Sequence, residues 1–290
     1  MQYKHWTNVN DFYHAAYSTL MRHEAQNMIP LGNLIIGYEG KDKTDWRDPV
    51  NWYMATVEEG GDILLTAIMT PPHNLTIYAT DNKINPIAID ALLDGIADHP
   101  LPGVMAEKTL AECFANAYTS RKGMKFEIKT DQRIYELTEV AHPPHMGKIR
   151  LMEEKDMSFY PYWINAMHAE FAAYGATTME IPTAEAAEGA LYRIVKKSIY
   201  CLEVDGVPVS LAGLSREMQN VIGVGPVYTP PYLRGKGYAS SCTAQVSQLA
   251  LDRGFEKCVL YTDLANPTSN SIYQRMGYRA IADSLMLEFV

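Results

Sequence analysis

One segment near the end of the chain, residues 227–239, constrains the fold more than any other. An apolar run at 221–227 precedes it and predicts a strand, and an amphipathic run at 239–253 follows it and predicts a helix. Between these elements the sequence Arg-Gly-Lys-Gly at 234–237 puts two glycines and two cations side by side. Glycine lets a backbone turn and approach a ligand closely, and the N–H groups at a helix N-terminus attract anions. The segment therefore predicts a phosphate-binding turn between a strand and a helix.

Two common phosphate motifs do not fit this turn. The P-loop needs G-x-x-x-x-G-K-[ST], and the dinucleotide fingerprint needs a third glycine where Ser240 stands. The pattern that fits is R-x-x-G-x-A, formed by Arg234, Gly237 and Ala239. It resembles the loop that holds the pyrophosphate of coenzyme A in the GNAT superfamily of N-acetyltransferases. The resemblance implies that these residues bind acetyl-CoA together with Gly235, Lys236 and Tyr238.

A second segment, residues 266–278, also resembles the GNAT family, in which an asparagine is followed by a tyrosine and then by a glycine and an aromatic residue. The resemblance implies that Asn266 and Asn270 contact the cofactor and that Tyr273 protonates the sulfur of the leaving coenzyme A. A phenol with a pKa near 10 can donate a proton at neutral pH. An alternative is that Tyr273 packs in the core and that Asn266 only caps the helix that Pro267 opens.

In the GNAT family the strand before the loop separates from its neighbour, and its free backbone groups receive the pantetheine arm and the thioester. The resemblance places this role on residues 227–229, which are Val227, Tyr228 and Thr229. The strand carries no Asp or Glu, although several family members keep a catalytic base there. Glu170, or else His168, is the nearest candidate base, on a helix expected to border the acceptor cleft. Both residues are also consistent with surface or capping roles, and a water relay is a third possibility.

From residue 148 onward the predicted elements are a strand, two helices, three strands, a helix, a strand, a helix and a strand. This is the order in the GNAT fold, and it implies an α+β (α/β) class with a mixed, mostly antiparallel sheet flanked by helices. The first half also alternates helices and strands, and Thr-Pro-Pro occurs after a strand at 70–72 and again at 229–231. We therefore expect a tandem of two related domains, with residues 1–141 lacking the coenzyme A loop, a linker at 142–147, and an acetyltransferase domain at 148–290. An unrelated N-terminal α+β domain is the alternative.

Composition excludes several other classes of protein. A net charge of -9 and a pI near 5.4 argue against a nucleic-acid-binding protein. The sequence contains no apolar segment long enough for a signal or a membrane span. No two of its four cysteines form a C-x-x-C pair, and His142 and His145 in the proline-rich linker are too few to make a metal site. We expect a cytoplasmic protein, as a monomer or a homodimer, with no metal.

The resemblance to the GNAT family implies an acetyl-CoA-dependent N-acetyltransferase. The acceptor would be a primary amine, in a small molecule or a peptide, that attacks the thioester directly in a ternary complex. The alternative is a non-catalytic module that binds acyl-CoA as a sensor or mediates protein interactions. No motif identifies the acceptor.

Overall fold

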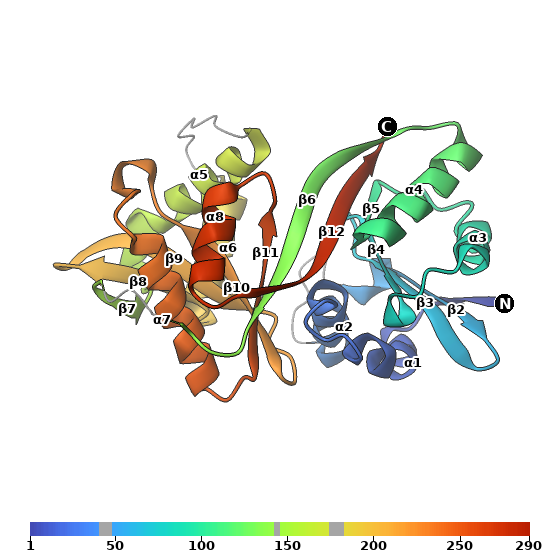
Figure 1. The fold of residues 1–290 in the computed structure, drawn as a ribbon, viewed down its shortest axis with the longest axis horizontal. Coiled ribbons are helices and arrows are strands. Elements are labelled where there is room, and N and C mark those ends of the chain that lie inside the picture. Colours follow the sequence, from blue (N-terminus) through green and yellow to red (C-terminus); the bar gives the residue numbers. More distant parts are fainter. Residues whose placement is uncertain (41–47, 142–145, 174–182) are drawn as a thin grey trace.

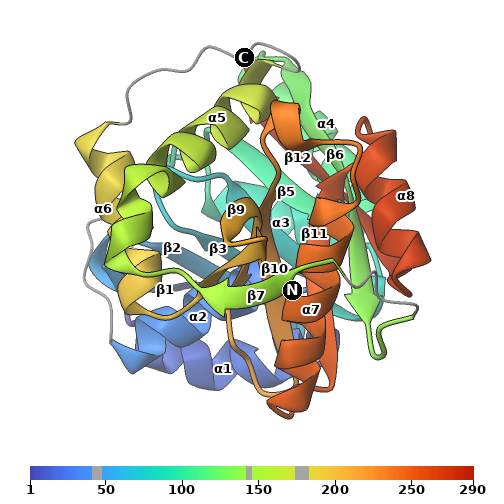
Figure 2. The same ribbon diagram turned by 90° about the vertical axis from the view of Figure 1, so that its left-hand side faces the viewer.

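The computed structural model describes residues 1–40, 48–141, 146–173 and 183–290 (Figure 1). Its strands form a single 12-stranded sheet in the order β1-β2-β3-β4-β5-β12-β6-β11-β10-β9-β8-β7. Helices cover both faces: in the second half α5 and α6 lie on one face and α7 and α8 on the other (Figure 2). The predicted α+β class, with a largely antiparallel sheet flanked by helices, is confirmed.

The two halves of the chain repeat one order of elements. The first half contains β1 (Gln2–Trp6), α1 (Val9–Met21), α2 (Met28–Glu39), β2 (Tyr53–Glu59), β3 (Asp62–Met69), β4 (Leu75–Ala79), α3 (Pro86–Gly95), β5 (Gly103–Glu107), α4 (Lys108–Lys122) and β6 (Phe126–Leu137). The second half contains β7 (Lys148–Leu151), α5 (Tyr160–Ala173), α6 (Ala184–Val195), β8 (Ile199–Val204), β9 (Val207–Ser215), β10 (Val221–Tyr228), α7 (Tyr238–Asp252), β11 (Lys257–Asp263), α8 (Pro267–Arg275) and β12 (Arg279–Phe289). In each half the fourth and fifth strands pair in parallel, as β4 with β5 and as β10 with β11. The predicted tandem of two related folds is therefore confirmed.

The repeated Thr-Pro-Pro, however, does not mark equivalent positions. Residues 70–72 lie between β3 and β4, whereas residues 229–231 follow β10. The counterpart of β10 is β4, so the counterpart of the glycine loop is the stretch 80–85. That stretch has no glycine, and the side chain of Asn85 caps α3 by accepting from the N–H groups of Ile87 and Ala88. The alignment of the halves through Thr-Pro-Pro was wrong because a three-residue match carries no topology.

The final strands of the two halves are exchanged. β12, the last strand of the second half, lies between β5 and β6, and β6, the last strand of the first half, lies between β12 and β11. Figure 1 shows these two long strands side by side between the halves. Leu285 and Leu287 of β12 complete the core of the first half, while Tyr135 and Leu137 of β6 complete the core of the second. The predicted linker at 142–147 falls largely outside the described residues, and the boundaries drawn around it stay predictions.

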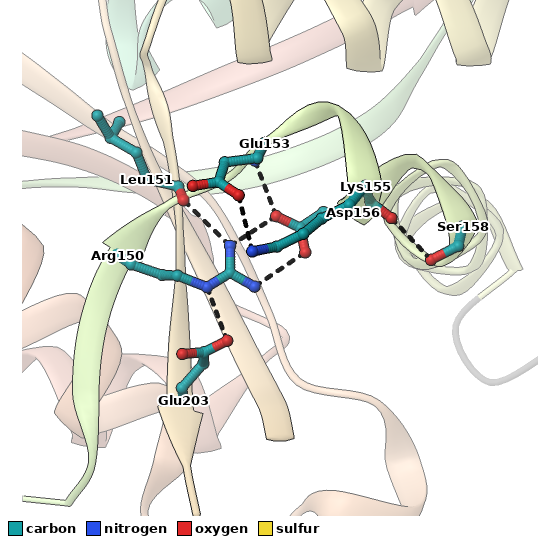
Figure 3. Close-up of polar contacts among 7 residues, drawn as sticks. All are labelled: Arg150, Leu151, Glu153, Lys155, Asp156, Ser158 and Glu203. Atoms are coloured by element: carbon teal, nitrogen blue, oxygen red, sulfur yellow. Dashed lines mark hydrogen bonds and ion pairs between the residues drawn. The ribbon is translucent and has the colours of Figure 1, made fainter. Parts of the chain in front are cut away.

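An ionic network around the buried carboxylate of Asp156 fixes the start of the second half (Figure 3). Arg150 of β7 donates to both oxygens of Asp156 at 2.6 and 2.9 Å and to Glu203 of β8 at 2.7 Å. The Glu153 N–H also donates to Asp156, at 2.8 Å. Burial raises the pKa of Asp156, but the hydrogen bonds from Arg150 and Glu153 outweigh burial and hold the pKa below its ordinary value. The network sets where the chain turns from β7 into α5.

Replacing Asp156 with Asn is expected to lower the free energy of unfolding by about 3 kcal/mol at pH 7, because it breaks a largely buried charge pair. In the wild type the depressed pKa stabilises the fold above about pH 4, the pKa of an unfolded Asp, and this contribution is lost as the pH falls through the folded pKa. Urea denaturation at several pH values measures both effects. Asp94→Asn, at a carboxylate that is 77% exposed beside Arg121, is the matched control and should cost under about 1 kcal/mol. Equal losses in the two variants would contradict the assignment.

Candidate functional site

β10 and β11 separate near their C-terminal ends. Their parallel pairing runs from Val221 opposite Lys257 to Gly223 opposite Val259, although both strands continue beyond this point. β10 stays paired with β9 as far as Tyr228, with a register shift after Val224. Beyond this point, the edge of β10 that faces β11 carries backbone groups without a strand partner among the residues described, as the resemblance implied.

The loop that follows β10 turns on two glycines. Gly235 has φ +77° and Gly237 has φ +81°, a left-handed conformation that side-chain-bearing residues rarely adopt. A Cβ atom on Gly235 would meet nothing within 4 Å, so the loop presents open backbone at this point. Gly237 is the N-cap residue of α7 and supplies no side-chain cap. The sequence thus builds an uncapped helix N-terminus behind an exposed glycine turn.

This N-terminus is electrostatically suited to an anion. The first N–H group of α7 with a helical acceptor is that of Ser241, which donates to Gly237 O at 3.0 Å, and the N–H groups before it have no acceptor within the described part of the chain. Lys236 is exposed, and it forms no ion pair with any residue that the structure describes. The free N–H groups, the helix dipole and one cation together fit a diphosphate.

Arg234 is held differently from what the sequence suggested. Its Nη2 donates to both carboxylate oxygens of Glu170 at 2.8 and 2.7 Å, and its Nε donates to Thr229 O at 2.9 Å. Its guanidinium also lies 5.7 Å from the ring centre of Tyr228, whose hydroxyl donates to Glu170 at 3.3 Å. Burial, followed by the charge of Glu170, raises the pKa of Tyr228 to about 12. Arg234 therefore ties the loop to α5. The sequence predicted Arg234 and Glu170 as site residues, but it did not predict that they form an ion pair.

The three residues predicted to receive the pantetheine arm lie at the end of β10. Thr229 is buried, and its hydroxyl is hydrogen-bonded to Ser210 of β9 at 2.8 Å. Its N–H has no hydrogen-bond acceptor among the residues described. Val227 is half-buried against the core beneath α7. The side chains at the end of β10 thus contact other parts of the protein. The backbone of these residues is the part that can bind a ligand.

Tyr273 lies on α8, which Asn266 caps by accepting the Ser269 N–H at 3.0 Å. The ring of Tyr273 packs at 5.8 Å from that of Tyr278, and the residue is 9% exposed. Burial raises its pKa to about 12, so the phenol is neutral over the physiological range. Its hydroxyl has no hydrogen-bond partner within the described chain and is not among the fully buried polar atoms. The ring of Tyr273 therefore belongs to the core, while its protonated hydroxyl has no structural hydrogen bond among the residues described.

The side chain of Asn270, by contrast, is hydrogen-bonded within the protein. Its amide oxygen accepts from the Tyr135 hydroxyl at 3.0 Å, and its amide nitrogen donates to Asp263 O at 2.9 Å and Asn266 O at 2.8 Å. These bonds use most of its hydrogen-bonding capacity inside the protein. Its assignment as a cofactor contact stays a prediction. Sequence reasoning missed Tyr135, because nothing in the chain's pattern shows that β6 crosses to the second half.

Two cavities lie away from the glycine loop. One of about 30 Å³ lies where β4 and β5 separate, the position in the first half that corresponds to the opening between β10 and β11. Gln26, Asn27 and Tyr78 line it, which leaves room for little more than a water molecule. The other, of about 450 Å³, lies between the halves beside Glu24 and Lys257. Neither is lined by the glycine loop.

Two further properties concern metals and membranes. Among the residues described, no group of three or more His, Cys, Asp or Glu side chains could hold a metal ion. In the same part of the chain, every helix is too short or too polar to cross a bilayer.

One family model and many solved structures resemble this chain. Residues 152–278 match the model of the acetyltransferase (GNAT) family. Over its whole length the chain resembles an acetyltransferase from the GNAT family of Colwellia psychrerythraea (TM-score 0.60, 10% identity, covering 100% of this chain and 99% of that one). It also resembles a GCN5-related N-acetyltransferase from Sphaerobacter thermophilus (0.58, 12%, 98% and 94%) and a tandem GNAT protein from the clavulanic acid biosynthesis pathway (0.56, 10%, 100% and 98%). No curated protein matches the chain. At these identities the structural likeness shows the fold alone.

Proposed function

Residues 152–278 form a GNAT-family domain, and from this we propose that the chain is an N-acetyltransferase that moves an acetyl group from acetyl-CoA to a primary amine. The observation that carries the proposal is the uncapped N-terminus of α7, behind two left-handed glycines and next to the separated end of β10. Members of this family are acetyltransferases, so acyl-CoA-dependent transfer is the starting expectation. The amine acceptor and the roles of individual residues are our proposal.

The loop and the strand end would hold the cofactor. The free N–H groups of α7 and Lys236 would bind the diphosphate, and Arg234 would contribute charge while it braces the loop against Glu170. The backbone of Val227 and Thr229 would bind the pantetheine arm. Bound acetyl-CoA supplies an acetyl thioester that is already activated toward amines.

The chain's own groups would then act on the reacting atoms. A backbone N–H at the end of β10 would polarise the thioester carbonyl and stabilise the oxyanion that forms when the amine attacks. Tyr273 would donate its phenolic proton to the departing sulfur: burial keeps the phenol protonated at neutral pH, and its hydroxyl forms no hydrogen bond within the described chain. Glu170 is the proposed base, or the carboxylate that orients the amine, because it lies beside the end of β10 through its bond to Tyr228.

The ion pair between Glu170 and Arg234 favours a second candidate. A base that is fully engaged by a guanidinium cannot take a proton until that contact opens. The chain could accordingly bind acyl-CoA without transferring the acyl group, as a sensor or an interaction module. A screen of primary amines for release of free coenzyme A thiol separates the two functions, since binding without release with any amine supports the module and excludes the enzyme.

We also propose that the protein works in the cytoplasm. Cys201, Cys242 and Cys258 are buried free thiols, and burial raises the pKa of each. Thiols of this kind persist in a reducing compartment.

Replacing Tyr273 with Phe is expected to lower kcat by about 100-fold, the size of a typical general-acid contribution, and to leave the affinity for coenzyme A unchanged. Steady-state kinetics with an amine from the screen measures the first effect, and calorimetry measures the second. Tyr278→Phe is the matched control: it removes a phenol from the same cluster, one that is bonded to Ser247 at 2.8 Å, and should cost about 1 kcal/mol of stability but no more than about twofold in kcat. Full activity of Tyr273→Phe would remove Tyr273 from the acid role.

A further inference from the structure

The strand exchange brings a residue of the first half against the helix that carries the proposed acid. β6 lies next to β11, with Tyr135 opposite Leu260, and its side chain points into the core under α7 and α8. Tyr135 is fully buried. Although it belongs to the half without the glycine loop, it is part of the second half's interior.

Two hydrogen bonds join Tyr135 to α8. Its hydroxyl donates to Asn270 Oδ1 at 3.0 Å and accepts from Gln274 Nε2 at 3.1 Å. Asn270 and Gln274 are four residues apart, so they lie one turn apart on the same side of the helix. The hydroxyl of Tyr135 therefore bridges two successive turns of α8, and Tyr273 lies between these two positions in sequence.

Asn270 extends this connection to the start of the helix. Its amide nitrogen donates to Asp263 O at the end of β11 and to Asn266 O at the helix N-cap. α8 has only nine residues, and among the residues described no side chain of the helix other than those of Asn270 and Gln274 forms a hydrogen bond to a strand or to another helix. Ile272, Tyr273 and Met276 also pack α8 against the core, but apolar contacts are non-directional. Cutting the directional network is therefore expected to shift the helix and the acid on it.

We infer that Tyr135 is a positioning residue for Tyr273, and that the first half of the chain thereby completes the active site of the second. This inference rests on the proposed function, because it gives Tyr273 the acid role. The first half lacks a cofactor loop, but through the exchanged strand β6 it supplies the hydrogen bonds from Tyr135 that orient α8.

The test is a double-mutant cycle with Tyr135→Phe and Tyr273→Phe. Alone, Tyr135→Phe should lower kcat by about 10-fold, while KM for acetyl-CoA and the thermal shift caused by coenzyme A stay within about twofold of the wild type. In the Tyr273→Phe background it should lower kcat no further, because it acts through Tyr273. A purely structural hydroxyl would give the same loss in both backgrounds, and that result would overturn the inference.

Tyr261→Phe is the matched control, since it removes another phenol that links the halves, by its bond to Gln26 O at 2.9 Å, but has no bond to α8. It should leave kcat within about twofold of the wild type. Gln274→Ala, at an exposed residue, covers the case in which Tyr135→Phe does not fold: it removes one of the two bonds and should lower kcat about threefold, again only when Tyr273 is present.

A measurement without turnover keeps this inference separate from the proposed function. With 3-fluorotyrosine at position 273, the ¹⁹F resonance should shift in Tyr135→Phe and stay in place in Tyr261→Phe. An unchanged resonance in Tyr135→Phe would overturn the positioning role even if the chain proved inactive toward every amine. Conversely, full activity of Tyr273→Phe would refute the acid role of Tyr273. The ¹⁹F shift would then show only that Tyr135 fixes the position of residue 273.

Discussion

A chain that carries Gly237→Asp is expected to bind no coenzyme A and to transfer no acetyl group. Gly237 has φ +81°, so any side chain strains the turn, and a carboxylate at this position places negative charge where the α7 N-terminus would receive a diphosphate. We expect the affinity to fall by at least about 1,000-fold, equivalent to about 4 kcal/mol. Titration calorimetry measures the affinity.

The control separates backbone strain from the loss of the site. Gly206 has φ +77° in the turn between β8 and β9, and a Cβ there would meet nothing within 4 Å, whereas a Cβ on Gly237 would make an ordinary contact with Met146 Sδ at 3.5 Å. Gly206→Asp should therefore cost a similar amount of stability and leave coenzyme A affinity unchanged. If Gly237→Asp kept its affinity, or if both variants lost it equally, the loop would not be the diphosphate site.

Residues 148–290, expressed without the first half, are expected not to fold. β12 takes both its neighbours, β5 and β6, from the first half, and β11 loses β6 as well. The core under α7 would lose Tyr135 and Leu137, and burial of large core side chains of this kind contributes about 3 kcal/mol each. The unpaired strand edges would also promote aggregation. Circular dichroism and size-exclusion chromatography should show no cooperative unfolding and no monodisperse species.

Co-expression of 1–141 with 148–290 provides the matched comparison. Because each fragment supplies the strand that the other lacks, the pair should co-purify and regain cooperative unfolding. A lone 148–290 fragment that unfolds cooperatively and binds coenzyme A would show that the exchanged strands are not needed for the second half.

Local pattern predicted most of the elements but not which strands are neighbours. The cap at Asn266 and the opening of the helix by Pro267 follow from side-chain chemistry within a few residues, and both occur where expected. Alternation of apolar residues tells which face of a strand is buried, but β6 would show the same alternation beside either half. The exchange of β6 and β12 is decided by long-range pairing, and the sequence gives no local signal of it.

The same limit applies to the candidate site. The turn at the glycines of the loop could be predicted because a positive φ value depends on the individual residue. The ion pair of Arg234 with Glu170, and the bond of Tyr135 to Asn270, join positions far apart in the chain. Glu170 was named as a candidate base without any sign that Arg234 would engage it. Contacts of this kind depend on how α5 and β6 pack, which side-chain periodicity does not specify.

The central claim is that the chain has one coenzyme A site, at the N-terminus of α7 in the second half. Calorimetric titration of the full chain with coenzyme A tests this claim most directly, because it counts sites as well as measuring affinity. We predict one site per chain, and a rise in stability of about 2.7 kcal/mol when coenzyme A is present at 100 times its Kd. Two sites per chain, or no binding at all, would contradict the claim.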